Sequence, residues 1–188
     1  MKQKQQNVIA VWLEWPISSF QTSAGSLARL RELVPSGTRI LHCRTEESFL
    51  RTLPSATHAL VWNFEPAWFS NAPNLRVLAT PAAGRELVPP VGPRGVTISF
   101  GAFHGVIISE TVLALMLAHV RGLYRAYDYQ RRGVLWPRSE LSPFCSTLVG
   151  TRAVILGYGH IGRAIGDRLA AFGVSITGIR RRNFAALD

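Results

Sequence analysis

The sequence predicts an α/β protein built on parallel sheets, and three observations support this prediction. Short apolar runs of strand length alternate with amphipathic segments over residues 1–100. A long helical pattern then covers residues 106–132, and a glycine-rich turn joins two further strand-like runs within residues 151–179. Alternating strands and helices of this kind are typical of a parallel sheet that carries helices on both faces.

Five apolar runs in the first part of the chain have the length and the β-branched or aromatic content of strands. They are residues 7–13, 38–43, 57–63, 74–79 and 95–100. Leucines recur at helical spacing within residues 22–34, and residues 46–53 and 65–72 are shorter helical candidates. We therefore expect residues 1–100 to form a flavodoxin-like five-stranded parallel lobe.

A single linking helix is predicted over residues 106–132. Its apolar side chains share one broad stripe, whereas Arg121, Arg125 and Asp128 lie elsewhere on the helix. A helix of more than about twenty residues is longer than usual, which suggests an element that joins two lobes or packs against a second subunit. With the boundary near residue 100, this helix belongs to a second domain of residues 101–188.

A glycine-rich turn opens the last structured segment of that domain. Residues 151–156 read as a strand, residues 161–173 as a helix and residues 174–179 as a second strand. The turn between the first strand and the helix has the spacing G-x-G-x-x-G and consists of Gly157, Tyr158, Gly159, His160, Ile161 and Gly162. This order predicts the first strand–helix–strand unit of a Rossmann domain, left incomplete, that binds a dinucleotide.

Each position of the turn has a physical role in that prediction. Gly157 allows the tight turn, Gly159 lets a pyrophosphate approach the backbone, and Gly162 lets the helix pack closely on the strand. The amides of His160 and Ile161 face the phosphates at the positive end of the helix dipole. We interpret the His160 side chain as a neighbour of the phosphates rather than as a catalytic group.

An arginine run follows the second strand, where a site for NAD carries an acidic residue that binds the ribose 2′-hydroxyl. Arg180, Arg181 and Arg182 stand there instead. A guanidinium can pair with a 2′-phosphate through two hydrogen bonds. The sequence therefore favours NADP over NAD through Arg180 and Arg181, although a solvated basic run on a loop explains the same residues.

Composition limits the other classes of function. The formal net charge is +10, but the arginines are scattered and do not alternate with aromatic residues, so we expect no nucleic-acid partner. Cys43 and Cys145 lie far apart without a metal-ligand pattern, so we expect neither a zinc site nor a disulfide. Glu14 interrupts the first apolar run, and residues 106–120 are too short to span a bilayer. These features predict a cytoplasmic protein without membrane contact or bound metal.

Four segments, taken in order, resemble the D-isomer-specific 2-hydroxyacid dehydrogenases. They are LRVLATPAAGREL, FHGVIISETVLALMLAHVRGL, RRGVLW and the run from LVGTRAVILGYGHIG to GIRRR, which together cover most of the chain from residue 74 onward. The resemblance implies a cytoplasmic NADP- or NAD-dependent oxidoreductase that transfers hydride between the nicotinamide and a small 2-hydroxy or 2-keto acid. It also implies that residues 1–100 form the substrate-binding lobe and residues 101–188 the start of the cofactor domain.

The resemblance assigns residues as well. Ala83 and Gly84 match the loop whose backbone amides hold the substrate carboxylate, and consecutive N–H groups can form such an anion-binding nest. The helix over residues 106–132 matches an element that often builds the family's dimer interface, so we expect a homodimer.

The departures from the family pattern matter equally. An Arg, a Glu and a His carry the family's reaction, and all three lie beyond the second Rossmann strand, where this sequence offers no match. We therefore name no catalytic residue, and we expect a C-terminally truncated chain with negligible turnover. Glu110, at the start of the linking helix, is expected to cap or pair locally. The alternative is a non-catalytic remnant that dimerises or senses a nucleotide, as corepressor-like relatives do.

Overall fold

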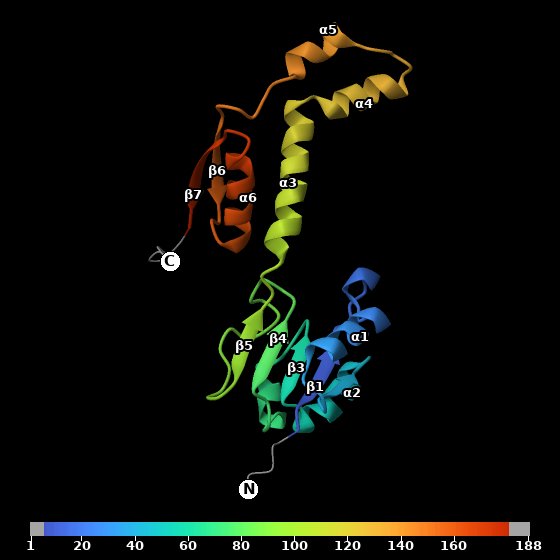
Figure 1. The fold of residues 1–188 in the computed structure, drawn as a ribbon, viewed down its shortest axis with the longest axis vertical. Helices are drawn as coiled ribbons and strands as arrows, with labels where there is room; N and C mark the ends of the chain where they lie inside the picture. The colour runs from blue at the N-terminus through green and yellow to red at the C-terminus, as the bar shows by residue number, and fades with distance from the viewer. Residues whose placement is uncertain (1–5, 181–188) are drawn as a thin grey trace. The chain divides into compact units, whose positions relative to one another are not determined.

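The structure is a computed structural model, and it describes residues 6–180 of the chain. The chain divides into two compact units, Met1–Gly101 and Ala102–Asp188. Figure 1 shows both units.

The first unit is a five-stranded parallel sheet with helices on both faces. Its strands are β1 (Val8–Trp12), β2 (Arg39–His42), β3 (His58–Val61), β4 (Val77–Thr80) and β5 (Thr97–Phe100). Their order across the sheet is β2-β1-β3-β4-β5, which is the flavodoxin-like order, and every neighbouring pair is parallel. The predicted α/β fold is thus confirmed, with each strand inside or within one residue of its predicted range.

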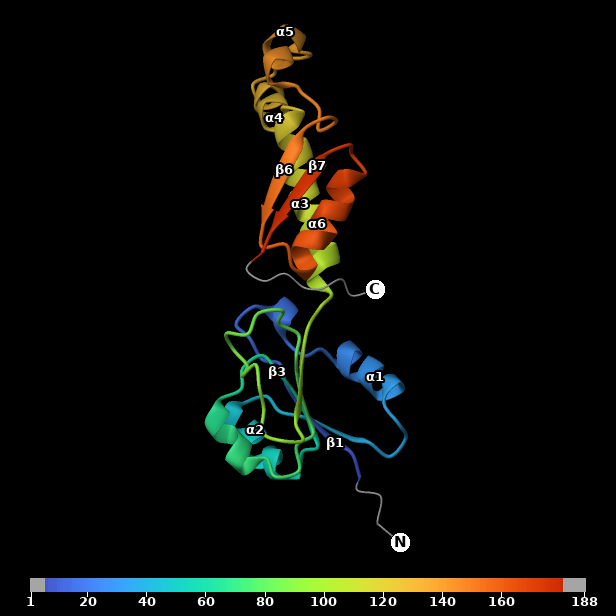
Figure 2. The ribbon, with the colours of Figure 1, turned by 90° about the vertical axis from the view of Figure 1, so that its left-hand side faces the viewer.

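Helices follow from the same strand order. Because β1 is followed by β2 on one side and β3 then pairs on the other, right-handed crossovers place their helices on opposite faces. Figure 2 shows α1 (Ala24–Leu33) and α2 (Glu46–Thr52) on the two sides of the sheet. Both helices begin with a capping box, in which a Ser or Thr hydroxyl binds the amide three residues later. Three short 3-10 segments complete the unit, at Ser18–Phe20, Leu53–Ser55 and Pro66–Asn71.

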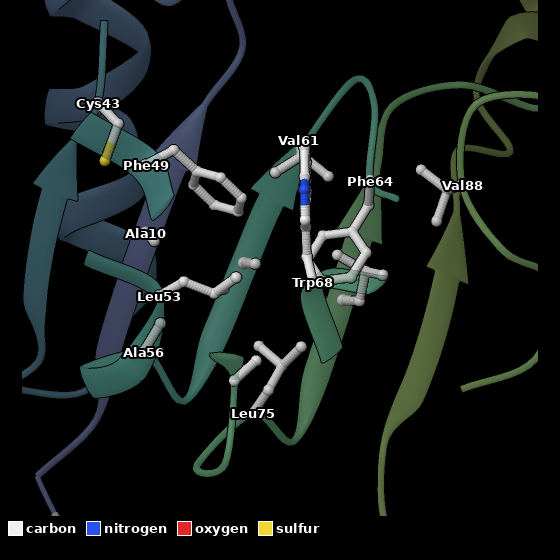
Figure 3. Packing of buried hydrophobic residues seen from close by; sticks show 13 residues of the cluster. Ala10, Cys43, Phe49, Leu53, Ala56, Val61, Phe64, Trp68, Leu75 and Val88 are labelled. Carbon is white, nitrogen blue, oxygen red and sulfur yellow. The ribbon is translucent and has the colours of Figure 1, made fainter. Parts of the chain in front are cut away.

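The core of the first unit lies on the face of the sheet that α2 covers. Phe49 of α2 is fully buried and stacks on Trp12 with ring centroids 5.2 Å apart. Phe64 and Trp68 meet edge to face at 5.5 Å beside it. Figure 3 shows Phe49, Phe64 and Trp68 with Leu53, one of several aliphatic residues that fill the space between them. Aromatic pairs in these geometries stabilise a core beyond the area that they bury.

The second unit contains one strand–helix–strand element and a group of helices. Its elements are α3 (His104–Val120), α4 (Leu123–Arg131), α5 (Arg138–Leu141), a 3-10 turn at Ser142–Phe144, β6 (Arg152–Leu156), α6 (His160–Ala170) and β7 (Ser175–Ile179). The parallel strands β6 and β7 pair from Arg152↔Ser175 to Leu156↔Ile179. Figures 1 and 2 both show α3 beside α6. A Cβ atom at Gly105 would lie 3.1 Å from the Cβ of Ala164, so small residues permit this close helix packing.

The predicted single helix over residues 106–132 is wrong. The helix breaks after Val120, and α4 continues at an angle of 65° to α3. Gly122 sits at the break with φ +63°, a left-handed conformation that cannot continue a right-handed helix. The amide of Ser146 donates to the Val120 carbonyl at 2.6 Å, and the Arg121 guanidinium donates to the Ser146 carbonyl at 3.0 Å. The segment after α5 therefore satisfies the end of α3.

Within residues 6–180, no single helix has both the length and the apolar character needed to cross a membrane, and α3 with α4 meets that test only as a bent pair.

Candidate functional site

The glycine-rich turn lies against the end of the neighbouring strand. The amides of Gly157 and Tyr158 both donate to the carbonyl of Ile179 at 2.9 Å. The Gly159 amide donates to the Gly157 carbonyl at 2.8 Å, and α6 then begins. Because Ile179 ends β7, these bonds bring the backbone before Arg180 directly against the turn.

Two glycines of the turn are required by the backbone itself. Gly157 has φ +92°, where a side chain would strain the chain. A Cβ atom at Gly162 would lie 2.5 Å from the Gly157 carbonyl oxygen and 3.2 Å from Ile155 Cγ2. The tight turn and the close approach of α6 to β6 therefore both depend on glycine.

Gly159 differs from its two neighbours in the motif. Its φ of −91° is open to any residue, and a Cβ atom there would meet no described heavy atom within 4 Å. The fold of the described residues therefore gives no reason for glycine at this position. The predicted approach of a pyrophosphate supplies one.

The N-terminus of α6 has no capping or acidic side chain of its own. No side chain caps its N-terminus, and its first turn contains no acidic residue. The amides of His160 and Ile161 stand at the first helical positions, where N–H groups have no partner inside the helix. The His160 side chain is exposed, with its ring beside Gly105 of α3. Such a helix end favours an anion.

The Tyr158 side chain packs inside the second unit. A Cβ atom on Gly178 of β7 would collide with its ring, and one on Gly166 of α6 would lie 2.8 Å from its hydroxyl oxygen. These two glycines make room for the ring, and they are not among the residues that the sequence motif predicted. A glycine in each flanking element beside an aromatic turn residue was the available signal.

Arg180 is half-buried directly after β7, at the position that the sequence indicated. Arg181 lies outside the described residues. The structure thus places one of the two predicted arginines next to the glycine turn.

A second candidate region lies at the carboxyl ends of β4 and β5 in the first unit. The Thr80 hydroxyl accepts the Ala82 amide at 3.2 Å, and the Gly101 amide donates to the Ala82 carbonyl at 2.9 Å. These bonds fix the start of the loop that presents Ala83, which is exposed, and Gly84, which is half-buried.

Two charged side chains outside the predicted set follow directly in this loop. The Glu86 carboxylate lies against Gly84, on the side that a Cβ atom would occupy. The Arg85 guanidinium lies over the Phe100 ring, 5.6 Å from its centroid. A carboxylate ligand at Gly84 would therefore be repelled by Glu86, whose side chain would have to move away. The same ligand would be attracted by Arg85.

Within residues 6–180, no group of three or more His, Cys, Asp or Glu side chains could hold a metal ion.

The fold and the turn define a class before any comparison. A parallel strand–turn–helix–strand unit, with two structurally required glycines and an uncapped helix end, is the opening of a dinucleotide-binding domain. Residues 113–186 match the family model described as D-isomer specific 2-hydroxyacid dehydrogenase, NAD binding domain. This segment is thus similar to the NAD-binding domain of that family, which is the family that the motifs indicated.

Individual relatives are similar to the chain as well. A 2-ketogluconate reductase of Gluconobacter oxydans is 29% identical over 107 residues, which are 55% of this chain and 34% of the reductase. A family protein of Aeromonas salmonicida shares the fold with a TM-score of 0.70 at 21% identity, over 96% of this chain and 56% of that chain. A probable 2-hydroxyacid dehydrogenase of Rhizobium etli, solved with NADP, HEPES and tartaric acid, gives 0.69 at 19%, over 97% and 55%. The chain therefore spans about half the length of these solved relatives and matches a third of the reductase.

Proposed function

We propose that this chain supplies the substrate-binding lobe and the opening of the cofactor domain of an NADP- or NAD-dependent oxidoreductase. The reaction is hydride transfer between the nicotinamide and a small 2-hydroxy or 2-oxo acid. The observation that carries the proposal is the glycine turn, where Gly157 and Gly162 are explained by the backbone and Gly159 is explained only by a ligand. The family match over residues 113–186 supports it.

The same geometry suggests what each part contributes. The amides of His160 and Ile161 bind the pyrophosphate at the positive end of α6. The amides of Ala83 and Gly84 hold the substrate carboxylate, with Arg85 available as a nearby cation. The bound nicotinamide supplies the hydride, and the residues of this chain position the two reactants.

The cofactor preference rests on Arg180. Its place beside the turn is where a 2′-phosphate or a 2′-hydroxyl of the adenosine ribose would lie. An arginine favours the phosphate through charge-assisted hydrogen bonds, so we propose NADP as the preferred cofactor and NAD as the weaker one. The NADP in the Rhizobium etli structure is consistent with this preference, whereas the matched family model is described as NAD binding.

Cofactor titration tests the proposal. Quenching of protein fluorescence by NADPH and NADH is measured in parallel on residues 1–188. We expect tighter NADPH binding, a loss of about tenfold or more in Gly159→Ala, and a reversed preference in Arg180→Glu. If the wild type and Arg180→Glu each bind NADPH and NADH with equal affinity, the role of Arg180 is refuted. Unchanged NADPH binding in Gly159→Ala would refute the site itself.

Turnover is a separate question. The Arg, Glu and His that perform the family's reaction have no match in residues 1–188, so we propose that this polypeptide alone does not reduce glyoxylate, hydroxypyruvate or pyruvate with NADPH. Turnover at the rate of an ordinary dehydrogenase would show that another group in these residues moves the proton.

A non-catalytic, dimerising role is the second candidate, and exposed apolar side chains on α3 favour it. Ile107 and Leu115, which lie on one face of the helix at spacing i, i+8, are each more than half exposed. A dimer formed through this face would cover them. Sedimentation of the wild type and of Ile107→Glu tests this: a dimer that the substitution splits supports it, and a monomeric wild type contradicts it.

A cytoplasmic location stays a prediction.

A further inference from the structure

A small hollow opens at the carboxyl ends of β1 and β3 in the first unit. Its volume is about 180 Å³, and it is lined by Trp12, Glu14, Trp15, Trp62 and Asn63. Ligands of open parallel sheets bind outside this edge. A volume of this size admits one functional group rather than a whole substrate.

Two of the indole rings form the outer wall. The Trp15 and Trp62 ring centroids lie 6.1 Å apart with their planes at 56°. Trp62 is held in place because its Nε1–H donates to the Phe20 carbonyl at 2.7 Å and its ring meets the Phe20 ring edge to face at 5.7 Å. The Gln21 side-chain amide binds the Trp15 carbonyl at 2.7 Å. The outer wall is therefore preorganised.

The third indole forms the inner wall and belongs to the core. Trp12 stacks on Phe49 at 5.2 Å and contacts Trp68 at 5.9 Å. Its position is consequently fixed by the packing of α2 on the sheet. Three tryptophans thus line one hollow, with the Trp15 and Trp62 rings in contact with each other, and we call this hollow the indole cage.

Glu14 supplies the charge. Its Oε1 lies 3.2 Å from Nε2 of His42, and 28% of its side chain is exposed. That contact orients the carboxylate, and only one of its two oxygens is engaged by His42. Among the described residues that line the hollow there is no Lys or Arg, although the whole chain has a formal net charge of +10. A carboxylate within an indole cage attracts a cation and repels an anion.

We propose that this hollow binds a cationic group, a guanidinium or an alkylammonium. If the chain acts on a 2-oxo acid, as proposed above, this group is the far end of the substrate whose carboxylate binds at Ala83 and Gly84. The inference thus extends the proposed function by naming the substrate class: a 2-oxo or 2-hydroxy acid that ends in a guanidinium or an ammonium.

The order of the strands gives the distance that such a substrate must span. The Ala83 loop follows β4, which neighbours β3, and β1 is one strand further. Adjacent strands lie about 4.8 Å apart, so the ends of β3 and β1 lie about 5–10 Å from the end of β4, which the loop follows. An extended five-carbon 2-oxo acid with a terminal guanidinium has this reach.

A second hollow lies along that path. It has a volume of about 230 Å³, and its lining includes Asn63, Glu65, Arg85 and Glu86. Asn63 lines both hollows, so the two adjoin at this residue. The carbon chain of the substrate would pass Asn63 on its way to the indole cage.

A polyhydroxylated substrate fits the cage less well. Its hydroxyl groups need several hydrogen-bonding partners, and the lining offers only Asn63 and the Glu14 carboxylate. One oxygen of Glu14 is already engaged by His42. The cage provides more ring surface than hydrogen bonds, which suits a cation.

A matched pair of small molecules tests the proposal without a cofactor or a 2-oxo acid. Butylguanidinium and N-butylurea have nearly the same shape and differ in charge. Isothermal titration of residues 1–188 is expected to show butylguanidinium binding at least tenfold tighter than N-butylurea. Equal affinities would overturn the proposal, and so would tighter binding of a polyol such as xylitol.

Substitutions locate the binding. Glu14→Gln keeps the size of the side chain and is expected to weaken butylguanidinium at least tenfold, and Trp15→Leu at least threefold. Glu32→Gln on α1 is the control, because it makes the same change of charge outside the lining and leaves affinity unchanged. If Glu14→Gln binds as the wild type does, or if Glu32→Gln weakens binding equally, the cation does not occupy this cage.

A further comparison separates this inference from the proposed function. Binding of 5-guanidino-2-oxopentanoate is compared with that of 2-oxohexanoate. A preference of at least tenfold for the guanidino acid, lost in Glu14→Gln, is expected. If butylguanidinium binds in the cage but neither acid nor NADPH binds, the proposed function fails and the cation site stands. If NADPH binds and the two acids bind equally, the substrate assignment fails alone.

Discussion

Replacement of Gly162 by alanine tests the geometry of the nucleotide turn most directly. The new Cβ atom would lie 2.5 Å from the Gly157 carbonyl oxygen, whereas a relaxed C···O contact is about 3.3–3.6 Å. The carbonyl belongs to the turn backbone, so α6 must move away from β6 by about 0.8–1.1 Å. Overpacking costs about 1–3 kcal/mol, and a clash with backbone, which cannot rotate away, lies in the upper part of that range at about 2–3 kcal/mol. Alanine regains about 1 kcal/mol of helix propensity, which leaves a net loss of about 1–2 kcal/mol.

That loss is measured in the second unit by thermal unfolding, with hydrogen exchange over residues 151–179 as the readout. For a unit of fewer than 100 residues, about 1–2 kcal/mol corresponds to a Tm lower by about 4–16 °C. Gly159→Ala is the matched control, because its Cβ atom meets no described atom within 4 Å and its stability should stay within about 0.5 kcal/mol of the wild type. An unchanged Tm in Gly162→Ala, or a larger loss in Gly159→Ala, would refute this reasoning.

Three further predictions concern the first unit and the cysteines. Burial and the nearby Arg76 hold the pKa of His58 below its ordinary value of 6.5, so the unfolded chain binds the proton more tightly. The contribution of His58 to stability is therefore complete above pH 6.5 and is lost as the pH falls below that value. Urea unfolding at pH 7.5 and at pH 5 should show this loss of stability. The variant His58→Asn should lose less stability between the two pH values. Burial raises the pKa of the Cys43 thiol, whereas Cys145 is exposed, so a thiol reagent should label Cys145 quickly and the variant Cys145→Ser only on unfolding. Phe49→Ala should destabilise the first unit by about 3–5 kcal/mol in urea unfolding followed by tryptophan fluorescence, because Phe49 is fully buried among aromatic rings; a loss below about 1 kcal/mol would contradict that packing.

The sequence by itself determined the strands, the first helices and the glycine turn. Apolar runs such as residues 57–63 have strand length and are bounded by turn residues, so their conformation depends on local pattern. The conformational role of Gly157 was equally predictable, since a turn with φ +92° excludes side chains. The resemblance to the family could be seen in the sequence for the same reason, because its motif is a run of locally required residues.

Only the tertiary structure decided where side chains meet across elements. The break at Gly122 lies within an apolar pattern that reads as one helix, and the bonds from the segment at Ser146 settle it. Tyr158 packs on Gly166 of α6 and Gly178 of β7, which belong to the next two elements of the chain.

The indole cage is the clearest example of a site that the sequence pattern alone could not predict. Trp12, Trp15 and Trp62 read as ordinary strand and loop residues, and His42 reads as the end of an apolar run. Their proximity follows from the strand order β2-β1-β3, which brings three separate strand ends to one edge of the sheet. Local patterns depend on neighbours a few residues apart, whereas this site depends on which strands pair, and that is fixed only when the whole sheet is packed.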